Sequence, residues 1–94
     1  MNKSAIVIDK VAFEGDEGGF HFKGTYLKEP KGKALIEIIR NSQVVREFLF
    51  PAYKIWNIPA HAKDIVEGLA NNSDEGLYAA GSNALGGNTY NKKD

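Results

Sequence analysis

The chain changes its hydrophobic period once, at Pro59, and this change restricts the folds that it can adopt. Before this point, residues 5 to about 50 are dense in β-branched and aromatic residues, and residues 20–28 alternate between apolar and polar side chains. After it, four apolar residues recur at i, i+3, i+4 and i+7: Ala62, Ile65, Val66 and Leu69. A period of two is typical of a strand, whereas the later spacing forms one apolar stripe on a helix. The order of the two patterns predicts a small sheet followed by one helix that packs on it.

Turn-forming residues divide the front of the chain into four strand segments. The expected strands are residues 5–13, 20–28, 34–40 and 43–50. Only Asn41 and Ser42 separate the last two segments, which is typical of a tight hairpin. We expect the helix to begin near Pro59, because proline suits a first helical turn, and to end at residues 71–73.

The segment between the strands and the helix, residues 53–58, is ambiguous. It reads either as a short fifth strand or as an irregular aromatic connector. The predicted fold class is therefore α+β: a four- or five-stranded antiparallel β-meander in a curled sheet, with one C-terminal α-helix packed on one face. We place a single domain at residues 1–72 and expect residues 73–94, rich in glycine and asparagine, to form a mostly flexible, disordered tail.

The composition of the chain excludes several classes of protein. There is no cysteine, which rules out disulfides, thiolate nucleophiles and cysteine-ligated zinc. Twelve basic residues balance twelve acidic ones, whereas proteins that bind nucleic acid through phosphates usually carry a basic excess. No apolar stretch approaches the roughly 20 residues that span a bilayer, and the first apolar run is too short for a signal peptide. We expect a cytoplasmic protein without membrane contact.

The register between strands assigns each residue to a face of the predicted sheet. A two-residue turn at 41–42 places Glu37 opposite Arg46, and a loop centred on Pro30 places Lys23 opposite Glu37. The result is a row of alternating charge, Lys23–Glu37–Arg46, on the face turned away from the helix. Such a row belongs near solvent, because burying it costs desolvation energy that pairing rarely repays.

The opposite face is the expected core. Its members are Phe20, Phe22, Tyr26, Ala34, Ile36, Ile38, Val45 and Leu49. Glu47 also falls on this face, so either its strand is an edge at which Glu47 reaches water, or the register is one residue off.

Apolar residues flank the charged row, so the second face is half-apolar. There are three alternatives for this face: the first strand and the connector cover it by curling into a small barrel, it forms a homodimer surface, or it serves as a ligand platform. The candidate interaction surface combines the row, its flanks and the connector aromatics: Lys23, Glu37, Arg46, Leu35, Phe48, Tyr53 and Trp56.

No motif in the chain predicts catalysis. His21 and His61 lack the Glu-x-x-His or His-x-x-x-His spacing of a metal site, and no serine has the sequence context of a nucleophile. We therefore predict no catalytic residue, no metal and no cofactor.

The sequence favours a non-enzymatic interaction module that self-associates as a homo-oligomer, through a sheet face or a strand edge. The alternative is a single-stranded nucleic-acid-binding module of the strand-strand-strand-strand-helix type. In that hypothesis Lys23 and Lys54 contact phosphates, while Tyr53 and Trp56 stack on bases. A small enzyme without a recognisable motif is the third hypothesis.

Overall fold

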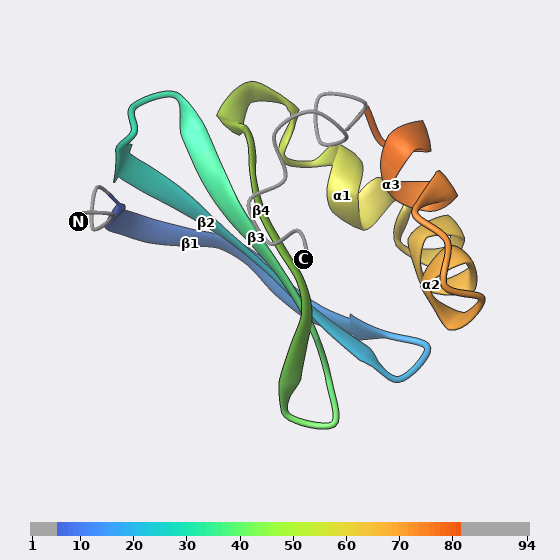
Figure 1. Cartoon of the computed structure of the whole chain (residues 1–94). Coiled ribbons are helices and arrows are strands. Elements are labelled where there is room, and N and C mark those ends of the chain that lie inside the picture. The colour runs from blue at the N-terminus through green and yellow to red at the C-terminus, as the bar shows by residue number, and fades with distance from the viewer. Residues whose placement is uncertain (1–5, 82–94) are drawn as a thin grey trace.

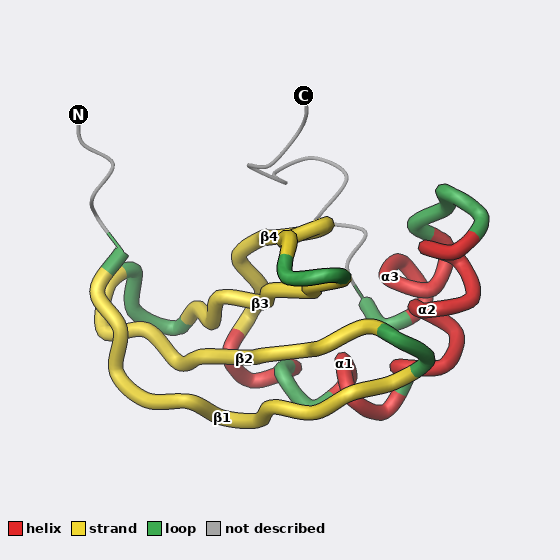
Figure 2. Tube along the Cα trace, turned by 90° about the horizontal axis from the view of Figure 1, so that it is seen from below, coloured by secondary structure: helices red, strands yellow, loops and turns green. Residues whose placement is uncertain are grey.

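The computed structural model describes residues 6–81 and confirms the predicted class, a four-stranded antiparallel sheet followed by helices (Figure 1). The strands are β1 (Val7–Glu17), β2 (Phe20–Glu29), β3 (Lys33–Arg40) and β4 (Gln43–Pro51). They pair in the order β1-β2-β3-β4, so that β1 and β4 are the two edges of a twisted sheet (Figure 2). The sheet is not closed, and the barrel-like alternative therefore does not hold.

Two-residue turns with left-handed backbone join the first and last hairpins. Asn41 and Ser42 have φ values of 54° and 65°, which confirms the predicted tight turn between β3 and β4. Gly18 and Gly19, with φ values of 56° and 86°, join β1 to β2. Positive φ at both central residues is the requirement of a type I′ turn, which matches the twist of the flanking strands. β1 thus continues to Glu17, although the sequence predicted its end at residue 13.

Helical turns follow the sheet directly. They are η1 (Ala52–Lys54), α1 (Asn57–Ala60), α2 (Ala62–Ala70) and α3 (Glu75–Ala79). Residues 53–58 are therefore a helical connector and not a fifth strand. The predicted apolar stripe lies on α2, where Ile65 and Leu69 are buried.

α3 occupies part of the segment that the sequence predicted as tail. Leu77 in α3 is fully buried, and Gly76 lies against the backbone of α2. The rest of the predicted tail, residues 82–94, lies outside the described residues.

The core lies between the sheet and the helices, which cover one face of the sheet (Figure 1). We call the opposite face of the sheet the outer face. The buried cluster consists of Phe20, Phe22, Ala34, Ile36, Ile38, Phe48, Phe50, Ile55, Ile58, Ile65, Leu69, Leu77 and Ala80. The predicted core residues of β2 and β3 are confirmed, apart from Tyr26, which is only partly buried. Those predicted in β4, Val45 and Leu49, are also only partly buried.

The β3–β4 hairpin keeps the predicted register only beside its turn. Arg40 pairs with Gln43 and Ile39 with Val44, but the register then shifts by one residue. Val45 is the extra residue, and the next pairs are Ile38 with Arg46, Glu37 with Glu47, and Ile36 with Phe48. A bulge of this kind turns every following side chain to the other face.

The bulge exchanges core and outer residues in the rest of β4. Phe48 and Phe50 enter the core, whereas Glu47 and Leu49 share the outer face with Glu37 and Leu35. The predicted register was therefore one residue off, and Glu47 faces away from the core for this reason.

Candidate interaction surface

The charged row on the outer face is Lys23–Glu37–Glu47, and not the predicted row that ends at Arg46. Lys23 lies opposite Glu37 as expected, but the bulge places Glu47 opposite Glu37 on the other side. Partial burial, and then the charge of Glu37, raise the pKa of the Glu47 carboxyl. Like charges directly opposite one another destabilise a sheet. The row therefore lacks the alternating charge on which its predicted role in an interaction surface depended.

Arg46 lies on the helix side of the sheet, so its predicted place on the outer face is wrong. Its Nε donates to Asp74 Oδ1 at 2.9 Å, and its Nη1 donates to the carbonyl oxygen of Val45 at 2.8 Å. Asp74 directly precedes α3, and both side chains are partly buried. Arg46 thus ties β4 to the start of α3.

Two apolar members of the predicted surface are buried, since Phe48 is 0% and Leu35 8% exposed. Phe48 belongs to the core, so its predicted place on the outer face is wrong. Leu35 lies on the outer face as expected but presents little surface.

The connector aromatics are exposed as the sequence suggested, but they lie apart from the charged row. Tyr53 is 86% exposed and Trp56 56% exposed. The Trp56 ring lies 5.7 Å from the ring of Phe13 on β1, centroid to centroid. Lys54 donates to the carbonyl oxygen of Gly81 at 2.9 Å and is thus held by the end of the described chain. The structure brings Lys23 and Glu37 together, and it places Tyr53 and Trp56 on the connector at the other face.

Exposed apolar residues lie at the start of β1, a strand that the sequence pattern assigned to no face. We call Ile6, Val7, Ile8 and Val11 the β1 patch; they are 36%, 45%, 59% and 48% exposed. β1 pairs only with β2, so one side of its backbone has no strand partner within residues 6–81. The run of β-branched residues was visible in the sequence, but only the strand order of the sheet shows that this run belongs to an edge strand.

A register shift in β1 brings Ile8 and Val11 to the same face of the sheet. Ile8 lies opposite Leu27 and Val11 opposite Thr25, so both project from the outer face. In a regular strand, residues three positions apart project from opposite faces. The shift between Ile8 and Lys10 therefore makes these two side chains neighbours on one surface.

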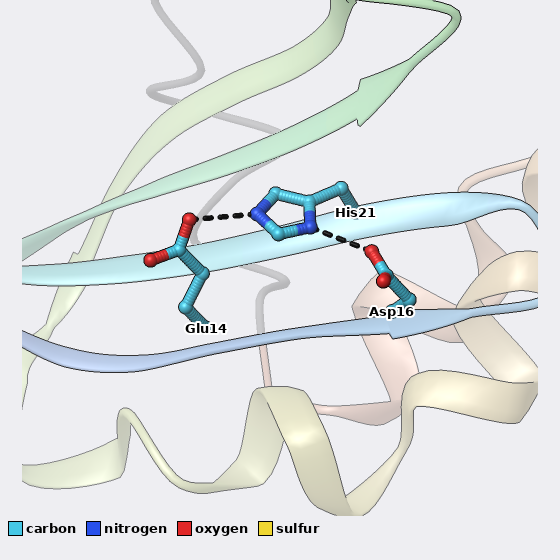
Figure 3. Close-up of polar contacts among 3 residues, drawn as sticks. All are labelled: Glu14, Asp16 and His21. Atoms are coloured by element: carbon cyan, nitrogen blue, oxygen red, sulfur yellow. Dashed lines mark hydrogen bonds and ion pairs between the residues drawn. The ribbon is translucent and has the colours of Figure 1, made fainter.

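A histidine held between two carboxylates lies at the other end of β1 (Figure 3). The His21 Nδ1 is 2.6 Å from Asp16 Oδ1, and its Nε2 is 2.8 Å from Glu14 Oε2. Hydrogen bonds to Glu14 and then to Asp16 raise the pKa of His21 above its ordinary value. The predicted end of the first strand at residue 13 left Glu14 and Asp16 outside it. Extension of β1 through residues 14–17 instead places them beside His21.

Within residues 6–81 no group of three or more histidine and acidic side chains is arranged to hold a metal ion.

We expect this cluster to make the stability of the fold depend on pH. Because the folded-state pKa of His21 is raised above its ordinary value of 6.5, the stabilisation that protonated His21 provides is complete below that pH. It is lost as the pH rises through the folded pKa. Thermal melts between about pH 5 and about pH 9 should show this loss in the wild type and in a His61→Gln control, but not in His21→Gln. A His21 pKa of 6.5 or lower, measured by NMR titration, would contradict this assignment.

Comparisons with family models, curated proteins and solved structures gave no match. Among residues 6–81, no helix is long and apolar enough to span a membrane.

Proposed function

We propose that the protein is a non-enzymatic interaction module that forms a homodimer through β1. The observation that carries the proposal is the β1 patch, four large apolar side chains exposed in and just before the start of an edge strand. Native proteins usually protect long edge strands, because their unpaired backbone groups invite pairing with another chain. Contiguous exposed apolar residues are typical of surfaces that another molecule covers.

The charges within β1 favour a second copy of the chain as the partner. Asp9 and Lys10 lie between Ile8 and Val11 in the sequence. In an antiparallel two-fold contact between the two β1 patches, centred near Asp9 and Lys10, each Asp9 lies near Lys10 of the second copy. Each Ile8 then faces Val11 of the second copy. Such a contact is self-complementary, as a two-fold interface requires, and each cross-strand pair contributes about 0.2–1 kcal/mol.

The irregular backbone of β1 favours a closed dimer over a growing filament. Register shifts occur between Val7 and Ile8, between Ile8 and Lys10, and between Val11 and Phe13. Bulges of this kind disrupt the regular ladder on which edge-to-edge aggregation depends. A two-fold contact uses each β1 edge once and closes.

The second candidate function, binding of single-stranded nucleic acid, is supported by the exposure of Tyr53 and Trp56. Lys23 lies on the outer face, away from the connector that carries these rings, and the Lys54 ammonium already donates to the Gly81 carbonyl oxygen, which weakens this proposal. Self-association is therefore the stronger proposal. The cytoplasmic location stays a prediction from the sequence.

Replacement of both Ile8 and Val11 by lysine is expected to abolish the dimer, because it places charges in the centre of the β1 patch. Both side chains are about half exposed, so the fold should survive. Val44→Lys is the matched control, since Val44 is 50% exposed on the opposite edge strand. Light scattering coupled to size exclusion should give a dimer for the wild type and for Val44→Lys, and a monomer for the double variant. Equal masses for all three proteins would refute the proposal.

A further inference from the structure

The second half of β1 differs from the β1 patch in having a regular backbone. From Phe13 to Glu17 the strand pairs with β2 without a register shift, ending with Glu17 opposite Phe20. The other edge of this segment has no strand partner within the described part of the chain. A regular free edge presents N–H and C=O groups at the spacing that an added strand needs.

A cavity of about 200 Å³ lies between this segment and the helices. Its apolar lining comes from Phe13 and Phe22 on the sheet and from Pro59 and Ala62 on the helices. Gly15 contributes no side chain to it, and a Cβ atom built on Gly15 would meet nothing within 4 Å. The space beside Gly15 is therefore open to a side chain that arrives from an adjacent strand.

Acidic side chains surround this edge. Glu14 and Asp16 project from the outer face, opposite Lys23 and His21 respectively, and Glu17 lies on the helix side at the cavity, so the carboxylates still outnumber the lysine at this edge. Each carboxylate carries two oxygens, so Glu14 and Asp16 accept further donors while they bind His21. No ion pair to Glu17 forms within residues 6–81. The edge thus complements a partner that carries positive charge.

We propose that the Phe13–Glu17 edge binds an extended protein segment with the pattern basic–apolar–basic, by strand addition. The segment's apolar residue lies opposite Gly15 and enters the cavity, because residues opposite one another in a ladder share a face. Its neighbours on either side project from the outer face, where lysine or arginine meets Glu14 and Asp16. This site is separate from the β1 patch and does not depend on self-association.

A capped heptapeptide, Ser-Thr-Lys-Leu-Lys-Thr-Ser, tests the site directly. Trp56 is the only tryptophan of the chain and contacts Phe13 in the cavity wall, so its fluorescence reports occupation. We expect saturable binding at low salt. The same peptide with glycine in place of leucine should bind at least about tenfold more weakly, because it leaves the cavity empty. A peptide with glutamate in place of both lysines should not bind.

Two variants separate binding at this site from binding elsewhere. Gly15→Leu fills the cavity and should weaken binding about tenfold or more while the melting temperature is retained, since Gly15 has ordinary strand geometry and free space. Asp16→Asn should weaken binding and reduce its salt dependence. Glu67→Gln, an exposed charge change on α2, should leave it unchanged.

The monomeric variant with lysine at positions 8 and 11 should bind the heptapeptide as the wild type does. This measurement distinguishes a wrong assignment of the strand-addition site from a wrong assignment of the dimer interface. Absence of saturable binding to the wild type would overturn the proposal, and so would equal affinity of the leucine and glycine peptides or of wild type and Gly15→Leu.

Discussion

Phe48→Ala is expected to lower the free energy of unfolding by about 3–5 kcal/mol, the cost typical of removing a buried phenylalanine. Phe48 is 0% exposed, lies opposite Ile36 in the ladder, and contacts the Phe50 ring edge-on at 6.1 Å between centroids. The substitution removes these contacts and leaves a cavity beneath the helices. Urea unfolding of the two proteins, followed by circular dichroism, measures the difference.

Leu49→Ala is the matched control, because Leu49 is the next residue on the same strand but projects from the outer face. It is only partly buried, so its truncation should cost clearly less than that of Phe48. The comparison tests the bulge at Val45. A strand without that bulge would bury Leu49 and expose Phe48, and a larger loss for Leu49→Ala would therefore show the described register to be wrong.

Gly76→Ala should destabilise the fold by about 3 kcal/mol, at the upper end of the usual cost of overpacking. A Cβ atom on Gly76 would clash with the Asp64 carbonyl oxygen and lie 2.5 Å from the Ile65 Cα. Both are backbone atoms of α2 and cannot rotate away. The added methyl group must separate α3 from α2 and expose the buried side chain of Leu77.

Gly15→Ala is the control for this substitution, since its Cβ would meet nothing within 4 Å. It should be neutral or slightly stabilising, because alanine reduces the freedom of the unfolded chain. If Gly76→Ala melted at the wild-type temperature, the close packing of α3 on α2 would be excluded.

The elements with a strong period were predictable from the sequence. The alternation of residues 20–28 and the spacing of Ile65 and Leu69 identified β2 and α2, and Asn41-Ser42 identified the hairpin. Each of these signals comes from residues close together in the chain. Local sequence is sufficient for them because backbone propensity and the buried face favour the same conformation.

Features that depend on contacts between distant segments were not predictable. The bulge at Val45 adds one residue without a glycine or proline to mark it, and it moved Arg46 and Phe48 to the other face. In the sequence, Gly76 has the surroundings of a glycine in a flexible tail. In the structure it allows the backbones of α3 and α2 to approach closely. Local sequence does not encode which residues must come close in space.

The candidate site was only partly predicted, for the same reason. The sequence led to the hypothesis of a contact through a sheet face or edge, which stays a proposal, and it placed Tyr53 and Trp56, both exposed, on the candidate surface. It did not identify the β1 patch, because Ile8 and Val11 share a face only after a register shift. Which strand forms an edge is a property of the whole sheet.

Sedimentation equilibrium of the wild-type protein over a wide range of concentrations tests the proposed function most directly. The chain has a mass of 10.3 kDa, and we predict a mass that rises to twice this value and stops there. Amide chemical shifts recorded over the same range should change mainly in residues 6–11. A mass of 10.3 kDa at every concentration would contradict self-association through β1.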